Sequence, residues 1–207
     1  MISILKVLLA GFLFAPVLAL AAQVAEVVGV KGSATVSTNG RNLPLTVGMQ
    51  VDESSEIRTD AGRVKLKFID GSVVVISDKS VFKVNSFSIN PDKTRKNAEF
   101  ALDVGLISQS VAKSDNARWE VRTPTVVTAV RGTEYIVDVA ADATTNVIIR
   151  SGSVLVKPTN AKKTRELPVN LDRKNTGILC DIGGKCLNAK QTTMDVLEAY
   201  ESRLSGF

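Results

Sequence analysis

The stretch that decides the fold reads TPTVVTAVRGTEY and spans residues 123–135. It belongs to a chain built almost wholly from short, valine-rich runs that glycine interrupts. Apolar residues at every second position are typical of β-strands, because successive side chains of a strand point to opposite faces. No catalytic motif accompanies the stretch. We therefore interpret it as part of a β-rich domain.

Other strand-like runs lie on both sides of this stretch, and each begins with glycine. They span residues 32–36, 62–68, 71–76, 105–107 and 152–156. Asn39-Gly40 and Asp70-Gly71 are turn signals between such runs. The spacing is too irregular for a repeat of fixed period. The sequence predicts an all-β single domain of many short strands, either solenoid-like or sandwich-like.

The first residues have the pattern of an export signal. Lys6 precedes an uncharged apolar run over residues 7–20, and Ala19-Leu20-Ala21 supplies small residues for a signal peptidase. An uncleaved membrane anchor is the alternative, but Pro16 interrupts the run, which is shorter than a typical membrane span. We predict a signal peptide over residues 1–21 and a periplasmic or secreted domain over residues 22–207, with no membrane span after cleavage.

Two cysteines near the C-terminus fit an oxidising compartment. Cys180 and Cys186 flank a Gly183-Gly184 pair, which suits the tight turn of a hairpin. Five residues separate the cysteines, whereas redox-active pairs are usually separated by two. We therefore predict a structural disulfide.

The last part of the chain predicts an amphipathic helix over residues 192–204. Met194, Leu197, Tyr200 and Leu204 recur at spacings of three and four, which places them on one helical face. Such a helix would pack on the β core and close an open edge. A helix that docks a partner is the alternative.

The chain has no histidine, the commonest general base and metal ligand. Paired carboxylates remain as candidates for hydrolysis, and acidic turns for weak calcium binding. The candidates are Asp52, Glu53, Glu56, Asp60, Asp70 and Asp78. All lie in or beside predicted turns, where Asp is expected for local hydrogen bonds. We predict a protein that is not an enzyme and has no cofactor.

The net charge of +5 is mildly basic, and the densest cationic stretch holds Lys157, Lys162, Lys163 and Arg165. A solvated loop is one interpretation of this stretch, and contact with an acidic envelope polymer or lipid head groups is the other. Nucleic acid is excluded as a partner, since no aromatic residues interleave with the charges. The single tryptophan, Trp119, packs in the core or offers a stacking platform for a sugar or a partner.

Several motifs, in their order and spacing, resemble the FecR-type domain over residues 24–158. They are the runs at 28–32, 45–51 and 57–62, the turn Phe68-Ile69-Asp70-Gly71-Ser72, Gly105, Thr123-Pro124, the signature Val130-Arg131-Gly132-Thr133-Glu134-Tyr135, and the closing strand at 152–156. The resemblance implies a β-rich periplasmic domain whose role is binding. The best-known members also have a cytosolic anti-sigma segment and a membrane span, in place of which this sequence predicts a signal peptide.

The resemblance also implies which residues matter. Its motif positions here are Asp70, Gly71, Thr123, Pro124, Arg131, Gly132, Thr133 and Gly152. We expect them to be structural, with the Arg131 guanidinium joining carbonyls or an acidic side chain inside the fold. The predicted function is a non-catalytic, exported binding domain that contacts an envelope protein or takes part in envelope signalling. A binding module for cell-wall glycan or another acidic envelope polymer is the alternative.

Overall fold

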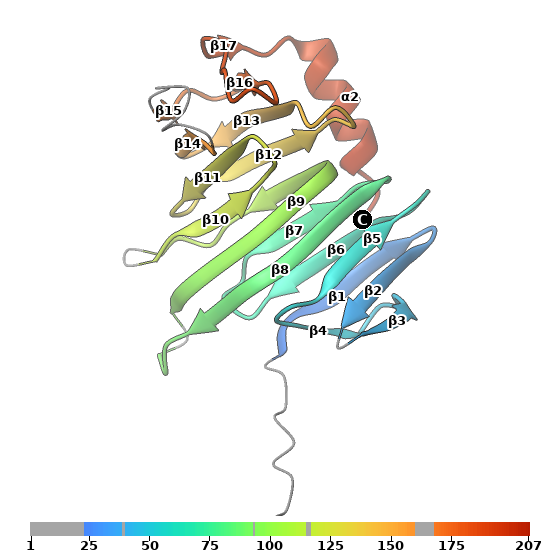
Figure 1. Ribbon diagram of the computed structural model, residues 1–207. Helices are drawn as coiled ribbons and strands as arrows, with labels where there is room; N and C mark the ends of the chain where they lie inside the picture. The colour runs from blue at the N-terminus through green and yellow to red at the C-terminus, as the bar shows by residue number, and fades with distance from the viewer. Residues whose placement is uncertain (1–22, 39, 93, 115–116, 160–167) are drawn as a thin grey trace, which may run out of the picture.

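The computed structural model describes residues 23–38, 40–92, 94–114, 117–159 and 168–207. These residues form an all-β domain with one C-terminal helix, as predicted (Figure 1). The predicted signal peptide and three of the predicted contact residues, Lys162, Lys163 and Arg165, lie outside the described residues. No helix in the described part of the chain has the length and apolar character needed to cross a membrane.

In the described residues, hydrogen bonds connect seventeen strands, which form two layers. The strands of the first layer, in spatial order, are β4 (Gln50–Asp52), β1 (Gln23–Lys31), β6 (Arg63–Phe68), β7 (Val73–Ile76), β9 (Arg95–Ser110), β12 (Glu134–Val139), β13 (Thr145–Ser151), β16 (Thr176–Cys180) and β17 (Lys190–Gln191). We call this layer sheet A.

The second layer, sheet B, shares β9 with sheet A. Its strands, in spatial order, are β3 (Arg41–Pro44), β2 (Ala34–Thr38), β5 (Glu56–Thr59), β8 (Ser80–Ile89), β9, β10 (Trp119–Arg122), β11 (Val126–Val130), β14 (Val154–Pro158) and β15 (Val169–Leu171). The β9–β10 pair is parallel, and the other pairs are antiparallel. The colours of Figure 1 show that the chain advances from one end of the layers to the other. Two facing layers correspond to the predicted sandwich, and the steady advance corresponds to the predicted solenoid.

Strand β9 joins the layers by changing sheets at Gly105. Val104 pairs with β8 of sheet B, whereas residues 105–110 pair with β12 of sheet A. Gly105 has a φ of 103°, and a Cβ there would lie 2.5 Å from the Cα of Ser80. Only glycine fits this position without strain, because it lacks the Cβ that would clash.

The core lies between the layers and is mostly aliphatic, with one aromatic cluster. Phe68 of sheet A packs edge-on against Trp119 of sheet B, with ring centroids 5.1 Å apart, and Phe100 lies 4.3 Å from the same tryptophan. These rings are buried. Aromatic pairs in such geometry contribute about 0.5–1.5 kcal/mol each beyond the burial of their area, so the cluster fastens the two sheets together.

Helix α2 (Met194–Leu204) packs on the outer face of sheet A. Leu197 contacts a strip of apolar residues that β9, β12 and β13 place on that face, namely Leu106, Ile136 and Ile148. Tyr200 and Leu204 lie beside it, half-buried. Two expectations were wrong: the helix covers a sheet face and not an edge, since the apolar strip lies on the face, and Met194 is 65% exposed.

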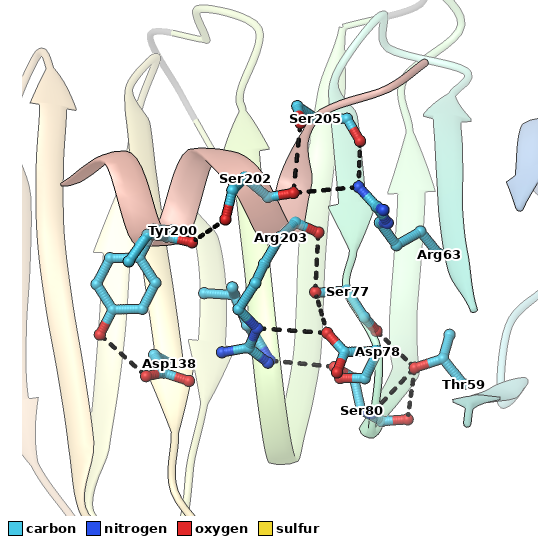
Figure 2. Close-up of polar contacts among 12 residues, drawn as sticks. Thr59, Arg63, Ser77, Asp78, Ser80, Asp138, Tyr200, Ser202, Arg203 and Ser205 are labelled. Carbon is cyan, nitrogen blue, oxygen red and sulfur yellow. Dashed lines mark hydrogen bonds and ion pairs between the residues drawn. The ribbon is translucent and has the colours of Figure 1, made fainter. Parts of the chain in front are cut away.

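Polar contacts hold the C-terminal half of α2 in place (Figure 2). The Arg203 Nε lies 3.3 Å from the Asp78 Oδ1, and the Tyr200 hydroxyl donates to the Asp138 Oδ2 at 2.9 Å. The Arg63 guanidinium donates to the carbonyl oxygens of Ser202 and Ser205. The two Arg63 hydrogen bonds satisfy carbonyls that a helix C-terminus leaves without an internal partner, and the positive charge of Arg63 interacts favourably with the helix dipole.

Candidate functional site

The Asp70-Gly71-Ser72 turn forms a buried polar cluster with Arg95. Asp70 makes an ion pair with the Arg95 Nη1, and its carboxylate accepts hydrogen bonds from the Ser72 backbone N–H and hydroxyl, both at 2.9 Å. The Arg95 Nη2 donates to the Ala112 carbonyl at 3.1 Å. The side chains of Asp70 and Arg95 are 4% and 1% exposed. This cluster is out of reach of a ligand, and it stabilises the fold by joining the turn to β9 and to the backbone at Ala112.

The motif threonines Thr123 and Thr133, and the neighbouring Thr125, are also internal. The Thr123 and Thr125 hydroxyls contact the Thr145 hydroxyl at 3.0 and 2.7 Å. The Thr133 hydroxyl donates to the Ser153 carbonyl at 2.8 Å. Pro124 between them is exposed, and its carbonyl accepts a hydrogen bond from the Thr159 hydroxyl at 3.0 Å. Buried polar groups need hydrogen-bond partners, and these threonine hydroxyls provide them inside the domain, where water does not reach.

Gly132 of the signature and Gly152 at the start of the closing strand allow close approach of the backbone. Gly132 has a φ of 120°, and a Cβ there would lie 2.9 Å from the Cα of Lys113. A Cβ at Gly152 would lie 2.8 Å from the Gly132 carbonyl oxygen. Side chains at either position would push neighbouring turns apart.

Arg131 departs from the expectation, because its side chain is exposed and does not join groups inside the fold. In β11, Val126, Thr128 and Val130 are buried, so the alternate positions face outward. Arg131 follows directly after the strand and is in phase with these outward positions. The alternation of the strand therefore directs the guanidinium to the surface.

Trp119 is fully buried, which rules out the surface stacking platform and leaves the core alternative. Its Nε1 donates to the Gln109 Oε1 at 2.6 Å, and the Arg95 guanidinium lies 5.6 Å from the ring centroid. A buried indole N–H needs such an acceptor. The outward side chains of the same strand are Glu120 and Arg122.

These outward side chains line a basic groove on the outer face of sheet B. The basic groove consists of Arg118, Arg122, Arg131 and Lys157 around a floor of Ala129 and Leu155. It comprises two adjoining hollows of about 250 and 330 Å³, which share Arg118 and the floor. The four cationic side chains are exposed. Arg122 lies on β10 and Lys157 on β14, Arg118 directly precedes β10, and Arg131 directly follows β11, so all four are held by the paired strands of sheet B.

The basic groove has an excess of positive charge. Its four cations face one carboxylate, that of Glu120, which leaves a formal charge of +3. Within the described residues, none of the four cations takes part in an ion pair, whereas Lys83 on β8 is paired with Asp103 at 2.7 Å. Exposed arginines next to an apolar floor are suited to binding carboxylate or phosphate groups.

Of the predicted contact residues in the described part of the chain, Lys157 lies in this groove and Trp119 does not. Sequence reasoning missed Arg118 and Arg122. The alternation in Arg118-Trp119-Glu120-Val121-Arg122 could have revealed them, because a strand that buries Trp119 and Val121 turns the charged residues outward.

The candidate carboxylates mostly hold local structure. Glu53 accepts a hydrogen bond from the Phe87 N–H at 2.6 Å, and Glu56 pairs with Arg58 and Lys83. The Ser77 hydroxyl donates to Asp78 and, with Arg203, lowers the pKa of this carboxyl. Across the described ranges, no three Asp, Glu or Cys side chains gather in a way that would hold a metal ion.

Cys180, the last residue of β16, forms a disulfide with Cys186. The Asp181 Oδ1 accepts a hydrogen bond from the Lys185 N–H at 3.0 Å inside this loop. The disulfide lies in the connection between β16 and β17, the last two strands of sheet A. It lies away from the basic groove, which belongs to sheet B.

Comparisons with known proteins agree with this fold. A family model described as "FecR protein" matches residues 55–155. Two crystal structures of a candidate anti-sigma factor from Parabacteroides distasonis each superpose with a TM-score of 0.57 at 19% identity. They cover 70% of this chain, which spans 63% of their own length. No curated protein matches the sequence. The match to the FecR family model places a FecR-type domain at residues 55–155 of the chain.

Proposed function

We propose that this protein is a non-catalytic binding module that acts in protein–protein interaction or signalling in the cell envelope. The observation that carries the proposal is the basic groove, an exposed, rigid surface whose cations have no partner among the described residues. The buried motif residues maintain the scaffold, and the exposed face is free for contact. Binding is what such an arrangement supports.

The relatives supply the regulatory part of the proposal. The structures with the same fold are named as candidate anti-sigma factors, which are regulators of transcription by their name. The export part rests on the signal-peptide pattern of residues 1–21 and agrees with the Cys180–Cys186 disulfide, since disulfides persist in oxidising compartments. An exported domain would pass information through a protein partner in the envelope.

Site-specific crosslinking in cells tests the proposal. A photoreactive amino acid replaces Ala129 on the groove floor, and in a control variant it replaces Lys67 on the exposed face of sheet A. We expect Ala129 to capture a defined envelope protein that Lys67 does not. The capture should disappear when Arg122→Glu and Lys157→Glu are added.

Two outcomes would overturn the proposal. Equal capture from both positions would show that the groove is not the contact surface. Capture of cell-wall glycan or another acidic polymer, with no protein, would replace it by the alternative of a polymer-binding module. Co-sedimentation with purified cell wall at low and high salt would then confirm the polymer.

A further inference from the structure

The strand register of sheet B arranges the groove in three rows. Arg122, Val127 and Lys157 are partners across β10, β11 and β14, and form the first row. Glu120, Ala129 and Leu155 form the second row in the same way. Arg118 and Arg131 directly flank the Trp119–Val130 pair and form the third. Cations therefore occupy the two outer rows, and an apolar floor separates them.

The row spacing matches one kind of ligand. Each row is two residues from the next, so the outer rows are about 13 Å apart at a strand rise of about 3.3 Å per residue. An extended peptide that lies along the strands has the same rise, and its side chains i, i+2 and i+4 project to one face. A helix advances only about 6 Å over four residues, which is about one row spacing, so carboxylates at i and i+4 of a helix would not reach both outer rows.

The charges define what each row accepts. The guanidinium groups of Arg122 and Arg118 offer paired N–H donors, which match a carboxylate. Glu120 lies in the middle row beside Ala129 and would repel a third carboxylate there. The groove thus favours an acidic side chain at each end and an apolar side chain midway.

We infer that the basic groove binds an extended acidic segment of a protein partner, with carboxylates four residues apart and an apolar residue between them. The inference rests on the proposed function and adds the chemistry of the partner. Polymers with regular negative charge lack the apolar middle group. Nucleic acid would lack a stacking surface, because the tryptophan of β10 is buried under the groove.

Synthetic peptides test the inference on the purified full chain by fluorescence polarisation. The matched peptide contains Asp-Ser-Val-Ser-Asp, and the control peptide of equal composition contains Asp-Asp-Val-Ser-Ser. We expect the control to bind about fivefold more weakly, the loss of one exposed ion contact. Arg118→Ala and Arg122→Ala should each weaken the matched peptide by a similar factor, and Lys67→Ala on sheet A should leave it unchanged.

The middle row provides a second readout, which a general effect of charge would not produce. A peptide with a central Asp in place of Val should bind the wild type more weakly than the matched peptide does. Glu120→Gln should recover much of that loss, because it removes the repulsion. Circular dichroism of each variant checks that the fold is intact.

The outcomes separate the inference from the proposed function. Equal binding of the two isomeric peptides, or no gain from Glu120→Gln, would overturn the inference. If Ala129 crosslinking nevertheless captures a protein in cells, the proposed function is retained with a partner of different chemistry. If crosslinking also fails, both are wrong. Binding of a polyanionic glycan in preference to the matched peptide would overturn the inference as well.

Discussion

Asp70→Asn tests whether the Asp70-Gly71-Ser72 turn stabilises the core through the buried ion pair between Asp70 and Arg95. The substitution keeps the shape of the side chain and removes its charge. The Arg95 guanidinium, 1% exposed, would then lose its ion-pair partner and keep the Ala112 carbonyl as an acceptor. Among the described residues its Nε has no hydrogen-bond partner, and its Nη1 would retain only a long contact to the Ser72 hydroxyl, at 3.4 Å.

The expected loss follows from the burial of both charges. Removing one partner of a buried ion pair costs about 3–5 kcal/mol, because the other charge stays buried without compensation. The Asn carbonyl oxygen would still accept the hydrogen bond from the Ser72 N–H, which places the Asp70→Asn loss near the lower end, at about 3 kcal/mol. Domains are stable by about 5–15 kcal/mol in total, so this loss is large.

Urea unfolding measures the loss, and Trp119 reports it, since it is the single tryptophan and is fully buried. The matched control is Asp103→Asn, which breaks the exposed pair with Lys83 and should cost less than about 1 kcal/mol. Adding Arg95→Met to Asp70→Asn should cost less than the sum of the single changes. A loss for Asp70→Asn no larger than for the control would refute the reasoning.

Three further predictions concern the C-terminal part. Replacing Cys180 and Cys186 by Ser should lower the free energy of unfolding by about 2 kcal/mol, and a thermal melt unchanged by the substitution or by reductant would contradict this. Leu197→Ala should lower the free energy of local unfolding of α2 by about 2–5 kcal/mol. Amide hydrogen exchange should then become faster in α2 and β12, but not in sheet B. Burial raises the pKa of Asp138 above its ordinary 3.8. Protonated Asp138 therefore makes its full contribution to the free energy of unfolding below pH 3.8, and this contribution is lost as the pH rises through the raised pKa. Urea unfolding over this range should show the stability difference between wild type and Asp138→Asn falling with pH, and a constant difference would be contrary evidence.

Local sequence signals predicted the strands and many of the turns. The run at residues 62–68 alternates polar and apolar residues, and the structure has β6 there with Val64, Leu66 and Phe68 buried. Gly105 was recognised only as a motif position. Its role in carrying β9 from one sheet to the other depends on the close approach of Ser80, which lies 25 residues earlier and gives no local signal.

The site was harder to predict than the fold. Lys157 was expected from the charge density of its stretch, but Arg118 and Arg122 come from a different strand. They meet Lys157 because β11 pairs with both β10 and β14. Strand order is a non-local property, so the groove could not be assembled from a single stretch of sequence.

The sequence alone determined the β class, the amphipathic character of the C-terminal segment and the family motifs, because each depends on residues that are near neighbours along the chain. Tertiary structure decided the rest. It buried Trp119, exposed Arg131, placed α2 on the face of sheet A and gathered four cations on sheet B. The physical reason is that inward and outward directions, and neighbours across a sheet, are fixed only when the strands pair and the two layers close on their core.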